Sequence, residues 1–208
     1  AISGSMEVVD KALEMKDFDR CERGWGILRA NLTKIRALVL SMLEYSREAR
    51  LVRTNSHFSD FVDSVITTSQ AKAQEKNVII ESSFDDDDAI VNVDTDKLHD
   101  AILNLILNAI EAVSSDKGRV FVRTLRDEVN GDVILTVEDN GPGLQDTEAI
   151  FLPFHSSKKG LNAGLGLSMT RKTVESHGGS IRAENSDEGG AKFVISLPCK
   201  KSGFKQSL

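Results

Sequence analysis

The chain has few aromatic residues, few cysteines and no broad basic face. One tryptophan and one tyrosine occur among 208 residues, and the formal net charge is -6. This composition argues against a nucleic-acid partner. The two cysteines, Cys21 and Cys199, stand near opposite ends of the chain, which disfavours both a disulfide scaffold and a cysteine metal cluster. A reducing, cytoplasmic location is therefore the simplest expectation.

Long apolar runs are also absent. No stretch of about 18 apolar residues occurs, so we expect no membrane-spanning segment within the chain. No secretory signal pattern is visible either. Residues 1–5 precede Met6 and resemble an added stretch, so we expect the natural segment to begin near Met6 and to be part of a longer protein.

Apolar residues recur at steps of three and four between residues 25 and 42, which predicts a long helix over about residues 19–50. This heptad seam consists of Trp25, Leu28, Leu32, Ile35, Val39 and Met42. A lone helix cannot bury such a seam. We therefore expect a shorter helix over residues 7–16 to pack against it, and a second copy of the chain to complete a homodimeric four-helix bundle. Packing within a single chain is the alternative.

The rest of the chain mixes helices and strands. Helices are expected at 58–75, 94–113 and 164–177, and strands at 78–80, 89–93, 119–124, 133–138, 180–183 and 192–197. Residues 49–56 are interpreted as a linker. The aspartate run at 85–88 is interpreted as a hairpin turn, because it lacks the spaced ligands of a calcium loop. The predicted class is α+β: a helical-hairpin dimerisation arm (6–50) followed by a two-layer α/β sandwich (57–200).

Two asparagines stand one turn apart inside a predicted helix. Asn104 and Asn108 share a helix face with Asp100 and Glu111, although asparagine is a poor helix former. A solvated polar face is the ordinary explanation. The functional alternative is a Mg²⁺ site, because this hard cation prefers oxygen ligands such as the side-chain oxygen of Asn108.

A carboxylate and three loop residues follow the strand at 133–138. Asp139 ends the apolar stretch, and Gly141, Gly143 and Leu144 come directly after it. A carboxylate at a strand end can accept a hydrogen bond from an adenine amino group, and glycines let the backbone approach the base. The Asp-Asn-Gly sequence is also good turn chemistry, so an ordinary turn remains the alternative.

The sequence Gly164-Leu165-Gly166-Leu167 opens another predicted helix. Free backbone amides at a helix N-terminus favour phosphate groups, and small residues permit close approach. The pattern is neither a Walker loop, which needs a following Gly-Lys-Ser/Thr, nor a dinucleotide fingerprint, which needs a surrounding βαβ unit. A plain small-residue cap is the alternative.

These three segments, in this order and at this spacing, resemble the N, G1 and G2 boxes of the Bergerat-type ATP-binding domain of histidine kinases. The segment 151–159 resembles the F box and the start of the ATP lid, with Phe151 and Phe154 expected to anchor its root. The resemblance implies ATP and Mg²⁺ as cofactors, with Asp139 on adenine, Asn108 on the metal and the amides of Gly164 to Gly166 on phosphate. The expected nucleotide-binding residues are Asn104, Asn108, Asp139, Gly141, Gly143, Leu144, Phe154, Lys158, Gly164, Leu165, Gly166 and Leu167.

The expected catalytic residues are Asn104, Asn108 and Lys158. Lys158, or its neighbour Lys159, is a candidate point charge for a phosphate, with a solvated lysine pair as the alternative. Gyrase-type ATPases of the same superfamily carry a glutamate four residues before the metal-binding asparagine, where it activates water. Asn104 occupies that position here and cannot act as a base. Hydrolysis is therefore disfavoured, and phosphoryl transfer, which needs mainly positioning and charge neutralisation, is favoured.

The resemblance implies a two-component sensor histidine kinase, which passes the γ-phosphate of ATP to a histidine and then to the receiver domain of a response regulator. The four histidines are His57, His99, His155 and His177, and none precedes the long helix. We therefore expect the acceptor helix to lie outside this chain, which would not autophosphorylate by itself. A non-catalytic nucleotide-binding dimerisation or signalling module, and a protein serine kinase on the same fold, are the alternatives.

Overall fold

The structure is a computed structural model, which describes residues 2–46, 50–84, 89–113, 117–154, 164–187 and 189–200. The chain divides into two compact units. The described residues 2–46 belong to the first unit, and the described residues between 50 and 200 belong to the second. Among the helices that the structure describes, none is long and apolar enough to cross a bilayer.

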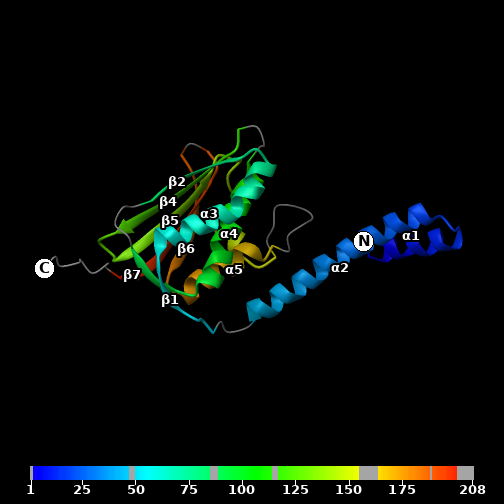
Figure 1. The fold of residues 1–208 in the computed structure, drawn as a ribbon, viewed down its shortest axis with the longest axis horizontal. Coiled ribbons are helices and arrows are strands. Elements are labelled where there is room, and N and C mark those ends of the chain that lie inside the picture. Colours follow the sequence, from blue (N-terminus) through cyan, green and yellow to red (C-terminus); the bar gives the residue numbers. More distant parts are fainter. Residues whose placement is uncertain are drawn as a thin grey trace. The chain divides into compact units, whose positions relative to one another are not determined.

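The first unit is a hairpin of two helices, α1 (Ile2–Glu14) and α2 (Phe18–Ser46) (Figure 1). Asp17 closes the turn between them: its amide donates to the Ala12 carbonyl at 2.9 Å, and its Oδ1 accepts from the Arg20 amide at 3.1 Å. This side-chain contact is a helix N-cap. The predicted long helix is thus confirmed. Several large apolar side chains on α2 are about half exposed within the chain: Trp25, Leu32, Ile35, Val39 and Met42.

The second unit is built on a seven-stranded sheet. Its strands are β1 (Thr54–His57), β2 (Ile79–Ser83), β3 (Ile90–Val93), β4 (Arg119–Asp127), β5 (Asp132–Asp139), β6 (Ser180–Asn185) and β7 (Ala191–Lys200). The order is β1-β3-β7-β5-β4-β2, and β6 pairs with β7. The β2–β4 pair is parallel, whereas the other pairs are antiparallel.

Helices α3 (Phe58–Glu75), α4 (Thr95–Ala112) and α5 (Gly166–Ser176) cover one face of this sheet (Figure 1). Alternate residues of β5 are buried from Val133 to Asp139, as expected for a strand that is covered on one side. Helix α4 supplies much of the core through fully buried Leu98, Ile102, Leu105, Ile106 and Ile110. The predicted α+β class, a helical arm followed by a two-layer sandwich, is confirmed.

Two predictions about connections are wrong. The strands β2 and β3 do not form a hairpin, because β2 pairs with β4 at one edge of the sheet while β3 pairs with β1 and β7 near the other. The aspartate run at 85–88 lies outside the described residues. The second error is the linker at 49–56, since β1 begins at Thr54 and pairs with β3. Its sequence, Thr-Asn-Ser-His, lacks the apolar alternation that would reveal a strand. The domain limits 6–50 and 57–200 stay a prediction.

Candidate nucleotide site

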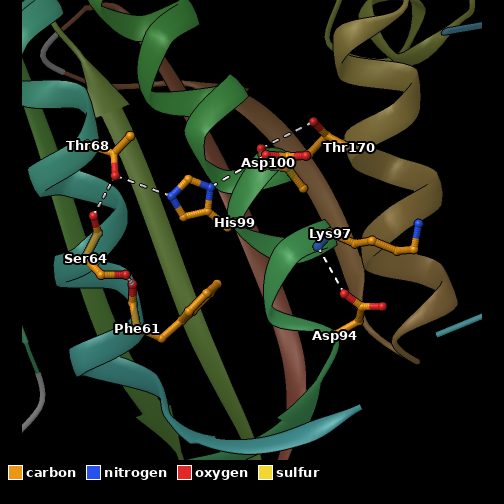
Figure 2. Close-up of polar contacts among 9 residues, drawn as sticks. Phe61, Ser64, Thr68, Asp94, Lys97, His99, Asp100 and Thr170 are labelled. Carbon is orange, nitrogen blue, oxygen red and sulfur yellow. Dashed lines mark hydrogen bonds and ion pairs between the residues drawn. The ribbon is translucent and has the colours of Figure 1, made fainter. Parts of the chain in front are cut away.

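Helix α4, which carries both asparagines, begins at a buried cap. Asp94 Oδ1 accepts a hydrogen bond from the Lys97 amide at 3.2 Å (Figure 2), and the Asp94 amide donates to His177 Nε2 at 2.9 Å. Nδ1 of the same imidazole lies 2.8 Å from the Thr173 carbonyl oxygen. A neutral ring with its proton on Nδ1 satisfies both contacts. The last turn of α5 therefore fixes the first turn of α4.

The other carboxylate oxygen of Asp94 binds the segment just before β1, at Val52. Oδ2 accepts from the Val52 amide at 2.9 Å, and this hydrogen bond is the main reason why the pKa of Asp94 lies below its ordinary value; burial acts in the opposite direction. Next along the chain, Arg53 Nη2 donates to the Ser176 carbonyl at 2.8 Å. The entering segment is thus bound to the ends of α4 and α5.

Asn104 lies where α4 meets the start of α5. Its Nδ2 donates to Thr170 Oγ1 at 3.1 Å, and the Thr170 hydroxyl lies 3.4 Å from the Ala101 carbonyl. Figure 2 shows Thr170 on α5 facing α4. A Cβ atom on Gly166 would come within 2.6 Å of Asn104 Oδ1. The α5 helix therefore begins directly against the Asn104 side chain and binds its amide group.

Asp139 ends β5 with its side chain only 3% exposed. Its Oδ1 accepts hydrogen bonds from the Gly141 amide at 2.8 Å and from the Ala191 amide at 3.3 Å. One donor belongs to the loop that follows β5, and the other belongs to the start of β7. These two amides fix the orientation of the carboxylate at the end of the sheet.

Two asparagine side chains hold the loop after β5. Asn140 Oδ1 accepts from the Arg119 amide at 2.8 Å, and Asn140 Nδ2 donates to the Lys117 carbonyl at 2.8 Å. Further along, Asn185 binds both the amide and the carbonyl of Leu144, at 2.6 and 3.0 Å. The loop that carries the predicted adenine-binding residues is thus held at its beginning and at its end.

The segment that resembles the F box is anchored by one aromatic ring. Phe151 is buried and packs edge-to-face on Phe193 of β7, with ring centroids 6.3 Å apart. The Arg171 guanidinium of α5 covers the Phe151 ring at 4.1 Å from its centroid and also pairs with Glu148 at 3.5 Å. Phe151 therefore connects the end of this loop to both α5 and the sheet, as predicted.

Phe154 does not share that role, and the prediction that its side chain anchors the root is wrong. The side chain is 57% exposed. Its backbone has a φ of 65°, and the Phe154 amide donates to the Gly164 carbonyl at 2.9 Å. This backbone hydrogen bond, rather than the ring, therefore joins Phe154 to Gly164, the residues on either side of 155–163. Lys158 and His155 lie outside the described residues.

The start of α5 offers its backbone rather than its side chains. Leu165 occupies the N-cap position and is buried, and Leu167 is partly buried against the core. Gly164 precedes them with a φ of 67°. A ligand at this helix end would therefore meet main-chain atoms.

The predicted segments converge on α4. A Cβ atom on Gly141 would lie 3.1 Å from the Ala112 carbonyl oxygen, just as one on Gly166 would contact Asn104. Asn108 stands one turn from Asn104 and one turn from Ala112, and it is partly buried. The structure thus brings the asparagine helix, the loop after β5 and the start of α5 together. Their chemical roles stay a prediction.

Sequence reasoning missed two residues that organise this region. Thr170 falls in the spacing Leu167, Thr170, Val174, so a polar residue on the inner face of a short amphipathic helix was the available signal. Asn185 precedes Ser-Asp-Glu-Gly-Gly and resembles ordinary turn chemistry, which gave no signal for a contact with a residue 41 positions away.

A polar cavity of about 460 Å³ is lined by residues from the ends of β5, β6 and β7. Its lining consists of Glu138, Glu184, Asn185, Ser186, Asp187 and Lys192, none of which is a predicted nucleotide-binding residue. Lys192 Nζ pairs with Glu184 at 2.9 Å within it. In the part of the chain that the structure describes, no group of three or more His, Cys, Asp or Glu residues is placed to hold a metal ion.

The sandwich and the converging segments define an ATP-binding domain of the histidine kinase type, and comparison with known proteins agrees. The family model described as histidine kinase-, DNA gyrase B- and HSP90-like ATPase matches residues 93–201, more than half of the chain. The chain belongs to this family. ATP binding is therefore supported.

Within this family, the similar curated proteins include sensor proteins and sensor histidine kinases. The sensor protein ChvG of Rhizobium meliloti (strain 1021) is 34% identical in an alignment 199 positions long that covers 85% of this chain and 34% of that protein. The sensor histidine kinase ZraS of Salmonella typhimurium (strain LT2) is 28% identical over 174 residues, which cover 83% of this chain and 37% of that protein. The chain thus spans about a third of the length of these relatives.

Solved structures show the same fold. The mycobacterial sensor histidine kinase MprB aligns with a TM-score of 0.63 and 26% identity, covering 72% of this chain and 99% of that one. The histidine kinase ThkA in complex with the response regulator TrrA aligns with a TM-score of 0.76 and 25% identity, covering 97% of this chain and 60% of that one. The resemblance to a sensor histidine kinase core is confirmed, and histidine protein kinase, the predicted enzyme class, is the class of these relatives.

Proposed function

We propose that this chain is the ATP–Mg²⁺-binding core of a two-component sensor kinase and that it transfers the γ-phosphate to a histidine. The main support for this proposal is that α4 contacts both of the other predicted nucleotide-binding segments. One end of the helix contacts the loop after Asp139 at Ala112, its middle contacts the start of α5 at Asn104, and Asn108 lies between them. A nucleotide lying along α4 would meet all three segments.

Asp139 is proposed to bind the adenine. Its carboxylate is nearly buried and is held by two backbone amides, so it cannot swing away when a ligand arrives. A rigid acceptor at the end of β5 suits the exocyclic amino group of adenine, and a buried polar group of this kind discriminates against bases that cannot donate to it.

Asn108 and the start of α5 are proposed to hold the phosphates and the metal. Mg²⁺ is usually bound by one or two protein oxygens together with substrate phosphates and water, and the partly buried Asn108 amide supplies one such oxygen. Backbone amides at Gly164 to Leu167 would face the phosphates with the positive end of the α5 dipole. The ion, when bound, would neutralise part of the phosphate charge. Lys158 is kept as a candidate for a further phosphate contact.

The reaction is proposed to be transfer rather than hydrolysis. The amide of Asn104 cannot accept a proton from water, and it is already bound to Thr170. Transfer to a positioned acceptor needs no strong base at this position. Neither α1 nor α2 contains a histidine, so the acceptor is proposed to lie on a further helix outside residues 1–208.

The helical arm is proposed to form a homodimer. The apolar seam of α2 is about half exposed along its length, and burying each large side chain contributes about 1.5–3 kcal/mol. A response regulator receiver domain is proposed as the downstream partner, supported by the complex of ThkA with TrrA. A cytoplasmic location belongs to the same proposal.

A complementation experiment tests the proposed transfer. A longer form of the protein that extends upstream of residue 1 and carries Asp139→Asn is mixed with the 208-residue chain and γ-labelled ATP. At an ATP concentration below the weakened Kd of the Asp139→Asn form, we expect an acid-labile, base-stable label on the longer form, because the shorter chain then holds most of the ATP. The matched control uses Asp139→Asn in both proteins and should give far less label.

Other outcomes separate the alternatives. An acid-stable label would identify a serine kinase on the same fold. Tight ATP binding with no label on the longer protein, both in this mixture and in the longer form without Asp139→Asn, would favour a non-catalytic module in which the nucleotide only sets conformation. Either result would contradict histidine phosphorylation.

A further inference from the structure

Asn185, the last residue of β6, makes two side-chain hydrogen bonds to one residue, Leu144. Oδ1 accepts from the Leu144 amide at 2.6 Å, and Nδ2 donates to the Leu144 carbonyl at 3.0 Å. Two residues that face each other in a hydrogen-bonded antiparallel pair exchange such bonds. The Asn185 side chain therefore takes the place of a strand and holds the loop backbone in one position.

This contact needs an acceptor and a donor from the same side chain. The carboxamide of Asn185 supplies both, whereas an aspartate of the same shape supplies only acceptors. Because the Leu144 amide must donate and its carbonyl must accept, the network fixes which way the carboxamide points. An aspartate would keep one bond and place a second oxygen against the Leu144 carbonyl oxygen.

The loop also passes close to the Asn185 side chain at Gly143. Gly143 has a φ of 76°, and a Cβ atom there would lie 2.8 Å from Asn185 Oδ1. Both the left-handed backbone and the proximity require glycine at this position. The contact thus extends over two successive residues of the loop.

The same hairpin holds the Asp139 carboxylate. Asn185 pairs with Ala191 across the β6–β7 ladder, and the Ala191 amide donates to Asp139 Oδ1 at 3.3 Å. Gly190, with a φ of 95°, runs so close to Asp139 that a Cβ atom would come within 1.8 Å of its carbonyl oxygen. Two paired residues of one hairpin therefore hold the carboxylate and the loop that faces it.

We infer that Asn185 is a positioning residue for adenine recognition: it sets the distance between Asp139 and the backbone of residues 141–144 without touching the nucleotide. The inference rests on the proposed function, in which Asp139 binds the adenine. Since Asn185 acts on the base end alone, its loss weakens the binding of a nucleotide but not the binding of a phosphate chain that lacks a base.

The test is Asn185→Asp in the 208-residue chain. Calorimetry with ADP–Mg²⁺ at a temperature well below unfolding gives the affinity for the nucleotide, and competition with inorganic pyrophosphate gives the affinity for phosphate alone. We expect at least a tenfold loss for ADP and a change within twofold for pyrophosphate. The matched control is Asn130→Asp at the opposite end of β5, where Nδ2 donates to Asp127 at 2.7 Å. It adds the same charge in a turn and should leave both affinities within twofold.

Two results overturn the inference: ADP affinity within twofold of the unchanged chain, or an equal loss for ADP and pyrophosphate. If Asn185→Asp does not fold, Asn185→Ala removes the same two hydrogen bonds without adding a charge, and the same two criteria apply. Failure of the proposed function looks different. In that case the unchanged chain binds no ADP, or Asp139→Asn binds it undiminished, whatever Asn185→Asp does.

Discussion

Replacing Asp139 by asparagine changes a single acceptor at the predicted adenine end of the site. In the structure, Oδ1 accepts from two backbone amides, at 2.8 and 3.3 Å. The amide oxygen of an asparagine can keep both contacts, so the local backbone should stay in place. The second oxygen becomes an NH₂ group, which turns an acceptor into a donor. The adenine amino group, itself a donor, would then meet another donor.

The expected loss follows from the hydrogen bond involved. A bond to a charged acceptor contributes about 1.5–3 kcal/mol, which corresponds to roughly a 10- to 150-fold weaker affinity for ADP. The free energy of unfolding should fall by about 1–2 kcal/mol, since the amide contacts persist but their acceptor loses its charge. Calorimetry measures the first quantity and urea denaturation measures the second.

Affinity within twofold of the unchanged chain, with an intact fold, would refute the role of Asp139 on adenine. A large loss of stability would instead refute the view that the two amide contacts survive the exchange. Asp139→Asn thus tests the chemistry and the local structure in separate measurements.

Three further changes test other parts of the account. Thr170→Val removes the hydroxyl that accepts from Asn104 Nδ2 at 3.1 Å, and it should lower the free energy of unfolding in urea by about 1–2 kcal/mol. The control Thr136→Val, on the open face of the sheet, should cost clearly less, and equal losses would contradict the contact. Val39→Glu in the α2 seam should raise the dissociation constant of the proposed dimer on the order of a hundredfold, measured by light scattering, whereas Arg36→Glu should leave it unchanged. A dimer that persists in both variants would refute dimerisation through the seam. Because the pKa of Asp94 is lowered in the folded state, its charged form stabilises the fold above about pH 3.9, and this stabilisation is lost as the pH falls through the folded pKa. The difference in free energy of unfolding between the unchanged chain and Asp94→Asn should therefore become smaller below about pH 4, and a difference that stays constant with pH would contradict this role of Asp94.

Elements with a strong periodic pattern were predictable from the sequence. The long helix with its heptad seam, the helix that Asp94 caps and the alternating strand β5 all appear close to their predicted limits. In each case local preference and burial favour the same structure. The three nucleotide segments were found because their residue types are unusual for the elements that carry them.

Long-range pairing was less predictable. The β2 strand pairs with β4 in parallel, so the hairpin expected from closeness in sequence did not form. The β1 strand is polar, and its partner β3 lies 33 or more residues away, so no local pattern could reveal it. Asn185 and Thr170 act through contacts across 41 and 66 residues. Such roles depend on the completed fold rather than on neighbouring residues.

A structure of the chain with a non-hydrolysable ATP analogue and Mg²⁺ tests the central claim most directly. We predict that the adenine amino group lies within hydrogen-bond distance of Asp139, that the metal lies about 2.0–2.1 Å from Asn108 Oδ1, and that the phosphates face the first turn of α5. A nucleotide bound elsewhere, or one whose base does not approach Asp139, would contradict the account.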